Sequence, residues 1–321
     1  MMLSATSSEY ALLARLSDDG GAIRRQLADA QEQVATGRVS DTYAGLGASA
    51  RTTLSLRPEV AHHAAWQANI DTATVRLDVT QTALKGITQI ASNFYAKTAA
   101  LNHVGASEAD SIAASAKLAL TQVAQLLNSK VGDIYVFAGQ DSANAPVPDT
   151  SAAALSMDLL ASDTATAPFS ATLGTSVPEV EIGDGQRVST GLLANRNTLA
   201  TSSAPTTGSY MRDVMRALAS LTGVTDNPGL EATAADARAR LGSAINAMTT
   251  ETGALGETQA SLTARKTTLS EMSLALTKQI SSVEDVDMAS ALTRVSALQT
   301  QLQASYQMIA AARSLSLAKF L

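Results

Sequence analysis

The chain of 321 residues contains no cysteine, and it has only three histidines. The lack of cysteine excludes disulfides, thiolate metal sites and thiol nucleophiles. Aromatic residues are also scarce, with four Phe, six Tyr and one Trp, so Ala, Leu, Val and Ile supply nearly all the apolar surface. Because these side chains pack well along slender helices, the composition favours long helices over a bulky globular core.

Positive charge is in short supply as well. The chain has 23 Lys and Arg against 29 Asp and Glu, which gives a net charge of −6. Nucleic-acid-binding proteins usually carry a basic face, so we expect no nucleic-acid partner. The N-terminus has no positive charge before Arg15 and no apolar run of signal-peptide length, so any export is expected to proceed without a cleaved signal peptide. Four glutamines interrupt the uncharged run between Arg294 and Arg313, and we therefore expect no membrane insertion.

Proline is absent from both ends of the chain. All seven prolines lie between Pro58 and Pro228, and five of them fall between Pro146 and Pro205. Because proline stops helices, this placement predicts two helical ends around a non-helical insert from about residue 139 to 207. The sequence predicts a mainly α fold, in which both chain ends form a long antiparallel, coiled-coil-like helical bundle with a small β-containing insert domain.

Apolar residues recur at helical spacing in the N-terminal part. The first stripe reads as one amphipathic face whose spacing is interrupted at Gly20 and Gly21, and it contains Leu13, Leu16, Ile23, Leu27, Ala30 and Val34. The second stripe keeps a heptad, with Thr80 and Thr98 in two of its places. Its apolar members are Ile70, Ala73, Leu77, Leu84, Ile87, Ala91, Phe94 and Leu101. Ser107 with Asp110 resembles a capping box, which predicts the start of a third helix.

The C-terminal part carries a longer repeat. One row recurs every seven positions at Leu241, Met248, Leu255, Leu262, Leu269, Leu276 and Val283. The alternate row is polar at places such as Thr252 and Gln259, which favours a helix packed in a bundle over a symmetric free dimer. Ser282, Asp285 and Asp287 predict a break and a new cap. The last helix then carries a stripe of Met288, Leu292, Val295, Leu298, Leu302, Tyr306 and Ile309.

Extended structure is expected in and just before the insert. Gly183-Asp184-Gly185 lies between apolar residues at positions 180, 182 and 188, which predicts a tight turn joining two short strands. The run 134–137 reads as an extended segment where the helical part enters the insert.

Few residues could carry chemistry. Glu59 with His62 and His63 is half of a carboxylate-bridged metal site, but no second Glu-x-x-His pair follows, so a solvated helix face is the preferred interpretation. The segment 45–50 matches a dinucleotide fingerprint, yet no apolar strand precedes it. We expect no metal, no cofactor and no catalytic residue, hence no enzyme. Trp66, the single tryptophan, is interpreted as a packing residue.

Segments at both ends resemble the flagellin family. Ala35-Thr36-Gly37-Arg38 and the following 40–46 are similar to the Gly-Arg and Asp-Asp-Ala-Gly-Leu region of that family, although the second Asp is absent. The stretches 69–77 and 80–84 are similar to the next helix of the family. At the C-terminus the similar segments are 285–287, 302–307 and 316–321. The resemblance covers about 1–140 and 208–321 and does not extend to the insert.

The resemblance implies an extracellular structural subunit of the bacterial flagellum that polymerises through its terminal helices. Its implied partners are copies of itself, other flagellar axial proteins, the flagellar export apparatus and an export chaperone. Under this interpretation the assembly interface consists of Leu13, Leu16, Ile23, Leu27, Val34, Leu292, Val295, Leu298, Leu302, Tyr306, Ile309, Leu317 and Phe320.

Within the family, three features resemble hook–filament junction subunits, the hook-associated protein 3 branch, more than filament flagellins. They are Tyr135–Gly139, Ala304–Gln307 and the terminal Phe320-Leu321. A filament flagellin is the alternative, and a secreted helical translocator or tip protein is a more distant one. The expected parts are an N-terminal assembly helix (1–40), the N-terminal half of the bundle (41–138), a variable insert domain (139–207), the C-terminal half of the bundle (208–284) and a C-terminal assembly helix (285–321).

Overall fold

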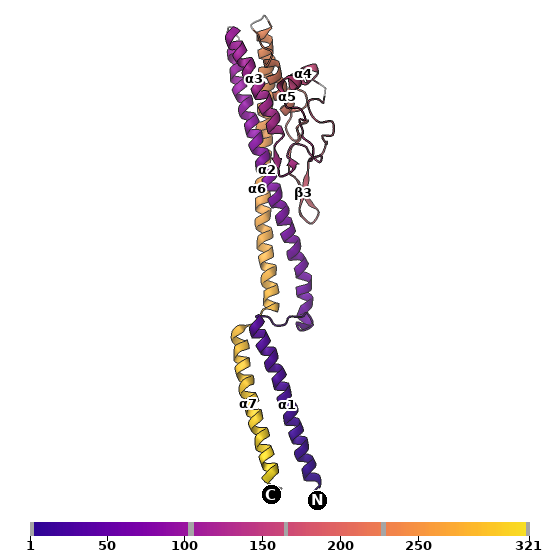
Figure 1. Cartoon of the computed structure of the whole chain (residues 1–321). Coiled ribbons are helices and arrows are strands. Elements are labelled where there is room, and N and C mark those ends of the chain that lie inside the picture. Colours follow the sequence, from indigo (N-terminus) through magenta and orange to yellow (C-terminus); the bar gives the residue numbers. More distant parts are fainter. Residues whose placement is uncertain (1–2, 102–105, 164–165, 226–228, 319–321) are drawn as a thin grey trace. The chain divides into compact units, whose positions relative to one another are not determined.

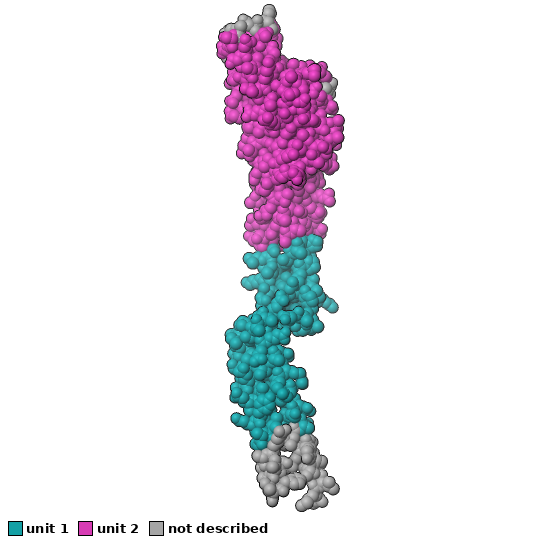
Figure 2. Space-filling model, in the orientation of Figure 1, with its two compact units in different colours: residues 1–62, 272–321 teal, residues 63–271 magenta. Residues whose placement is uncertain are grey.

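The computed structural model describes residues 3–101, 106–163, 166–225 and 229–318. The described chain is mainly helical, as the sequence predicts (Figure 1). The principal helices are α1 (Leu3–Thr36), α2 (Ala50–Ala100), α3 (Ala106–Leu127), α5 (Tyr210–Leu221), α6 (Leu230–Glu284) and α7 (Met288–Ala318). The chain divides into two compact units, one made of 1–62 and 272–321 and the other of 63–271 (Figure 2).

Helices α2 and α6 pair in an antiparallel manner in the second unit (Figure 1). Lys266 of α6 donates a hydrogen bond to Asp71 of α2 and forms an ion pair with it. The guanidinium of Arg238 on α6 lies 4.4 Å from the ring centroid of Tyr95 on α2. As the residue number rises along α2, that of its partner on α6 falls, which defines the antiparallel direction. The predicted antiparallel helical bundle from both halves of the chain is therefore confirmed.

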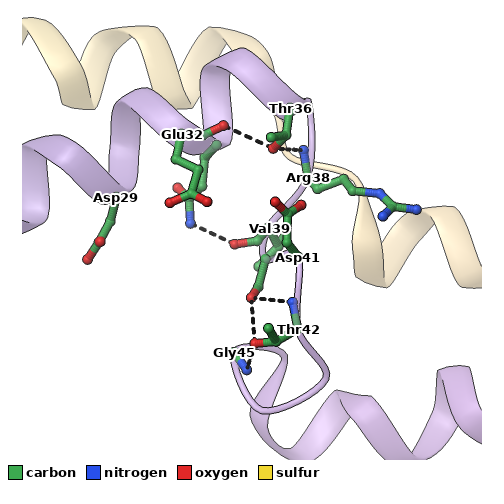
Figure 3. A pocket seen from close by; sticks show the side chains of 10 residues that line it. Asp29, Glu32, Thr36, Arg38, Val39, Asp41, Thr42 and Gly45 are labelled. Atoms are coloured by element: carbon green, nitrogen blue, oxygen red, sulfur yellow. Dashed lines mark hydrogen bonds between the residues drawn. The ribbon is translucent and has the colours of Figure 1, made fainter.

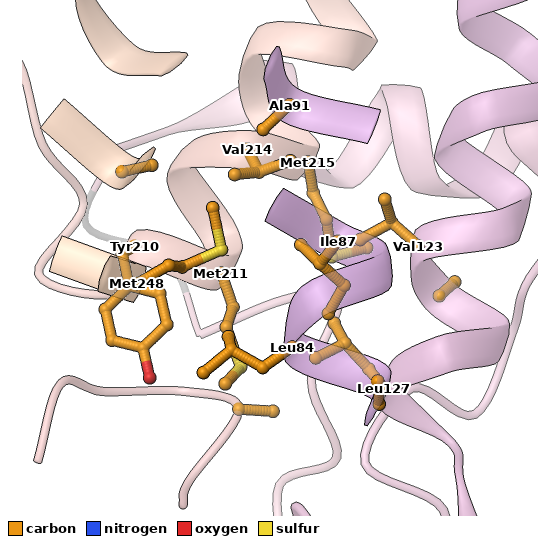
Figure 4. Close-up of a cluster of buried hydrophobic side chains, with 14 of the residues drawn as sticks. Leu84, Ile87, Ala91, Val123, Leu127, Tyr210, Met211, Val214, Met215 and Met248 are labelled. Carbon is orange, nitrogen blue, oxygen red and sulfur yellow. The ribbon is translucent and has the colours of Figure 1, made fainter. Parts of the chain in front are cut away.

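The heptad stripes form the core of this unit. Every apolar member of the stripe from Ile70 to Leu101 is buried, as are Thr80 and Thr98. Leu84, Ile87 and Ala91 lie close to side chains of α3, α5 and α6 (Figure 4). On α6 the heptad residues from 241 to 269 are buried, whereas Leu276 and Val283 are only half-buried. The predicted row of apolar residues at every seventh position is therefore buried at its first five positions and only half-buried at its last two.

The insert contains a helix that the sequence did not lead us to expect. Helix α4 (Ala152–Ala161) lies between two of the prolines, so the prediction of a non-helical insert is wrong. Its sequence is rich in Ala and Leu, which are strong helix formers, and Leu155 and Leu159 are buried against the core. A ten-residue segment between prolines can therefore still form a helix when one face packs, as α4 does on α5.

Two small antiparallel sheets complete this unit. β1 (Lys130–Val131) pairs with β2 (Ile134–Tyr135), so the run before the insert is extended as predicted. β3 (Glu179–Gly183) and β4 (Gln186–Ser189) form the predicted hairpin around Asp184 and Gly185. Asn69 of α2 and Arg265 of α6 donate hydrogen bonds to the carbonyls of Glu181 and Ile182, which fix the hairpin on the helix pair.

Two buried polar contacts fasten the rest of the insert. Oε1 of Glu251 on α6 accepts hydrogen bonds from three successive backbone N–H groups at 198–200, with N–O distances of 2.8–3.0 Å. Arg212 of α5 donates to the backbone carbonyls of Ser162, Asp163 and Ala167. Both side chains are nearly inaccessible to solvent, so these contacts tie loop backbone to helices without exposed charge.

One helix start differs from the sequence prediction, and two helices continue through residues that often interrupt helices. Helix α1 continues through Gly20 and Gly21, so these glycines do not break it. Helix α3 has already begun at Ala106, so Ser107 lies inside the helix and is not its cap. Pro58 lies within α2 and does not end it. None of the helices in the described ranges is both long and apolar enough to span a bilayer.

The predicted cap between the last two helices is confirmed. Helix α6 ends at Glu284 and α7 begins at Met288. The Asp287 carboxylate accepts hydrogen bonds from the backbone N–H groups of Ala289 and Ser290 and from the Ser290 hydroxyl. These contacts satisfy amides that the first turn of a helix leaves unpaired, and the negative charge lies at the positive end of the helix dipole.

Candidate assembly interface

The terminal helices α1 and α7 pack against one another along a narrow apolar seam. Its buried members are Ile23, Ala30 and Leu298. Leu27, Val295 and Leu302 pack against them and are partly buried. The three-four spacing places these residues on one face of each helix, and each face covers the other.

Not every residue of the predicted interface lies in this seam. Leu292 and Tyr306 of α7 are 51% and 49% exposed. At 3.6 residues per turn they project about 120° and about 80° around the axis from Leu298, so they lie away from the centre of the seam. Within the single chain the predicted stripe along α7 therefore divides into a buried row and an exposed flank.

The remaining predicted interface residues lie at the margins of the seam or beyond the described side chains. Leu16, Val34 and Ile309 are half-buried. Leu13 and Leu317 belong to helices whose backbone is described, but their side chains lie outside the described part. Phe320 lies outside the described residues.

The seam also contains small residues that the sequence analysis did not single out. Ala291 and Ser305 are buried, and together with Leu298 they recur every seven residues on α7. Gly20 of α1 faces Ser305. The signal was present as small residues seven positions on either side of Leu298, but a search for large apolar residues passes over them.

A short antiparallel contact joins the segment after α1 to the end of α6. The backbone N–H of Val39 donates to the Glu284 carbonyl at 2.7 Å, and the Val286 N–H donates to the Gly37 carbonyl at 2.9 Å. Gly37 has a φ of +71°, a conformation that favours glycine. The Gly-Arg motif therefore serves as a joint in which the backbone pairs with residues almost 250 positions further along the chain.

Glu284 also anchors this joint through its side chain. One guanidinium nitrogen of Arg57 donates to both carboxylate oxygens of Glu284 at 2.8 Å, and the Arg38 guanidinium lies 3.9 Å away. The hydrogen bonds that Arg57 donates to the Glu284 carboxylate raise the pKa of Arg57. The Glu284 side chain is only 11% exposed, whereas that of Arg57 is 47% exposed, so solvent reaches the ion pair from the arginine side.

A hollow of about 360 Å³ lies beside the joint (Figure 3). Its lining includes Asp29 and Glu32 of α1 and Asp41 of the following loop. Ser40 and Thr42 form a local turn in which the Thr42 N–H donates to the Ser40 hydroxyl. The side chains around the hollow are therefore mainly acidic and hydroxyl groups rather than a catalytic arrangement.

The residues considered for chemistry do not form a site in the described structure. Glu59, His62 and His63 all lie on α2, and among the described residues no three His, Asp or Glu side chains are grouped to hold a metal ion. Segment 45–50 forms a turn, a short 3₁₀ helix (Gly47–Ser49) and the start of α2. Trp66 packs against the core, as predicted.

Several solved structures share this fold. A putative flagellar hook-associated protein from Vibrio parahaemolyticus has a TM-score of 0.58 and 13% identity, with 76% of this chain and 99% of that chain covered. FlgL from Bacillus cereus has a TM-score of 0.52 and 19% identity, with 71% and 99% covered. FlgL from Xanthomonas campestris has a TM-score of 0.52 and 13% identity, with 69% and 98% covered. No curated protein matches this chain.

Both ends of the chain match models of known protein families. The bacterial flagellin N-terminal helical region matches residues 10–142, and the bacterial flagellin C-terminal helical region matches residues 239–321. These two matches include most of α1 and α6 and all of α2, α3 and α7, and together they cover more than half of the chain. The chain therefore belongs to the bacterial flagellin family and is an extracellular structural protein of the flagellar axis, not an enzyme.

Proposed function

We propose that this chain is the subunit of the hook–filament junction. The observation that carries the proposal is the fold: the solved hook-associated and FlgL chains align over 98–99% of their own length. The segments Tyr135–Gly139 and Ala304–Gln307 support the same branch of the family. A filament flagellin is the competing function, since the matched helical regions are common to the whole family.

The proposed assembly segment is the α1–α7 pair. The seam between Ile23, Ala30 and Leu298 holds the two helices together within one chain. The exposed flank of α7, with Met288, Leu292 and Tyr306, is apolar and remains uncovered in the single chain. We infer that neighbouring axial subunits cover this flank, because such a row of exposed apolar side chains is typical of an interaction surface.

Export is part of the same proposal. We infer that the chain passes through the flagellar export apparatus without a cleaved signal peptide and that an export chaperone binds it beforehand. The absence of cysteine and the amphipathic ends support this route. Deleting the export ATPase in the native host should keep the chain inside the cell, while secretion through an unaffected general pathway would contradict the route.

Localisation on the flagellum tests the junction assignment. An epitope placed after Gly185, at the turn of the β3–β4 hairpin, leaves both terminal helices unchanged. Gold-labelled antibody should mark one narrow band where the hook meets the filament. Labelling along the whole filament would show a filament flagellin instead, and absence of label from flagella that contain other axial proteins would contradict both functions.

A further inference from the structure

The joint after α1 places two guanidinium groups around one carboxylate. The Glu284 side chain at the end of α6 lies between Arg57 of α2 and Arg38 of the segment that follows α1. Arg57 donates to both carboxylate oxygens, with N–O distances of 2.8 Å. The Arg38 guanidinium is 3.9 Å from Oε2, which is within the range of an ion pair but too far for a hydrogen bond. One arginine therefore binds Glu284 directly while a second lies beside it.

The backbone holds Arg38 close to Glu284. The Val39 N–H donates to the Glu284 carbonyl at 2.7 Å, and Arg38 pairs with Asp285 in a short antiparallel bridge. Among the described residues, Arg38 forms an ion pair with no carboxylate other than that of Glu284. Its nearest charged partner is therefore already bound to another arginine.

Both arginine side chains have room to move. They are 50% and 47% exposed, so neither is fixed by packing. A hollow of about 230 Å³ is lined by both arginines and by Glu284. Gly37, with a φ of +71°, has no other atom within 4 Å of the place where a Cβ would lie, so the backbone next to Arg38 is uncrowded as well. A small movement of Arg38 is therefore enough to bring it within hydrogen-bond distance of Glu284.

We propose that Glu284 exchanges between these two arginines, which gives the joint two states. In the first state, which the structure describes, the carboxylate ties the end of α6 to α2 through Arg57. In the second state Arg38 replaces Arg57, and the carboxylate ties α6 to the segment after α1. Glu284 is shielded from solvent, and a shielded carboxylate without a partner is costly. Arg38 therefore allows α6 to release Arg57 without leaving that charge unpaired.

The exchange is a property of the single chain, so it goes beyond the junction function and does not depend on it. It changes the partner of a side chain at the end of α6 and interrupts no helix. A neighbouring molecule that contacts one state more favourably would shift the joint to that state, since only a difference in affinity moves such an equilibrium.

Amide hydrogen exchange in the full chain tests the proposal. The Val39 and Val286 N–H groups bridge the joint, so their protection factors report whether it is closed. Arg38→Gln and Arg57→Gln each leave one arginine for Glu284, whereas the double variant leaves none. Each single substitution should lower these protection factors less than about twofold, and the double variant should lower them roughly fivefold, the factor that a whole surface ion pair supplies.

Two controls separate the exchange from a general effect of lost charge. In a Glu284→Gln chain neither arginine substitution should change the protection factors, because the shared partner is gone. Arg51→Gln removes an exposed arginine from the same helix as Arg57 and should leave the joint unchanged. A double variant whose loss is only the product of the two single losses would show that the arginines act independently, and this would overturn the exchange. Unchanged protection in the double variant would overturn it too.

A side-chain measurement tests the second state directly. In the parent chain the Nε–H of Arg57 is hydrogen-bonded to Glu284 and that of Arg38 is not. In Arg57→Gln, nuclear magnetic resonance of ¹⁵N-labelled arginine should show the Arg38 guanidinium exchanging its protons with water more slowly than in the parent chain, and the signal is assigned by its loss in Arg38→Gln. The same exchange rate in both chains would show that Arg38 does not replace Arg57.

Discussion

Gly20 of α1 lies against Ser305 of α7, so closely that a Cβ built on Gly20 would be 3.4 Å from the Ser305 hydroxyl oxygen. Ser305 is 4% exposed. The helix backbones approach closely at this point because both positions carry small residues. The space admits a methyl group at ordinary contact distance but no longer side chain, which makes the crossing a sensitive probe of the seam.

The effect of a substitution at Gly20 on stability should therefore depend on the size of the new side chain. Gly20→Ala should stabilise the α1–α7 pair by about 0.5–1 kcal/mol, since alanine restricts the unfolded chain and fits the space. Gly20→Leu should destabilise the pair by about 1–3 kcal/mol through overpacking. Thermal unfolding followed by circular dichroism measures both. Gly21→Leu is the control, because the only atom near Gly21 is at the flexible end of the Arg25 side chain. Equal melting temperatures of the two leucine variants would contradict the close approach of α1 and α7 at Gly20.

Leu298→Asp should separate the terminal helices. Leu298 is 6% exposed in the seam, and an unpaired buried carboxylate costs about 3–5 kcal/mol. The core of the second unit contains no α7 residue, so its unfolding transition should be unchanged. Limited proteolysis should then cut α1 and α7 faster while leaving that core intact. Gln299→Asp places the same charge on the neighbouring exposed position and should behave like the parent chain.

The cap at Asp287 should make the start of α7 sensitive to acid. Hydrogen bonds from the Ser290 hydroxyl and from the backbone N–H groups of Ser290 and Ala289 lower the pKa of Asp287 below its ordinary value of 3.8. Because the folded pKa is below the unfolded one, the stabilisation is fully present above pH 3.8 and is lost as the pH falls through the folded pKa.

Asparagine tests this prediction, since Asn also caps helices but does not titrate. The protection factor for amide hydrogen exchange in the first turn of α7, which corrects for the intrinsic effect of pH on the exchange rate, should fall in acid more in the parent chain than in Asp287→Asn. Asp285→Asn serves as the control, because no hydrogen bond in the described structure uses its carboxylate. The same acid response in Asp287→Asn as in the parent chain would show that the cap does not titrate.

Glu251→Ala should loosen the insert. The substitution leaves three backbone N–H groups without their acceptor, of which only that of Ala200 lies in a buried residue and costs about 1–3 kcal/mol to leave unpaired. Denaturant unfolding should show a loss of about 1–3 kcal/mol, and the amides of 198–200 should exchange much faster. Glu257→Ala, six residues further on and exposed, is the control and should change the unfolding free energy by less than about 0.5 kcal/mol.

The sequence predicts the parts of this fold that depend on periodic burial. The stripe from Ile70 to Leu101, most of the heptad on α6, the hairpin at Gly183–Gly185 and the cap at Asp287 all follow local rules of spacing and turn chemistry. These features can be predicted without knowing which distant residues they contact.

Other features depend on contacts between segments far apart in the chain. The acceptor role of Glu251 requires a loop some 50 residues away, and the joint of Gly37 with Val286 requires pairing across most of the chain. Helix α4 has no continuous polar face to mark its period, so its hydrophobic pattern gave little signal although its composition favours a helix. For the candidate interface, spacing alone could not distinguish Leu298 in the seam from Tyr306 on the exposed flank.

We propose that the paired helices α1 and α7 are the segment through which this chain assembles. The most direct measurement is the amount of each tagged variant in purified flagella, relative to its amount in the cell, in a host that lacks the natural chain. The account predicts that Gln299→Asp enters flagella like the parent chain, whereas Leu298→Asp is made but is absent from them. Incorporation of Leu298→Asp at the parental level would show that assembly does not require the seam.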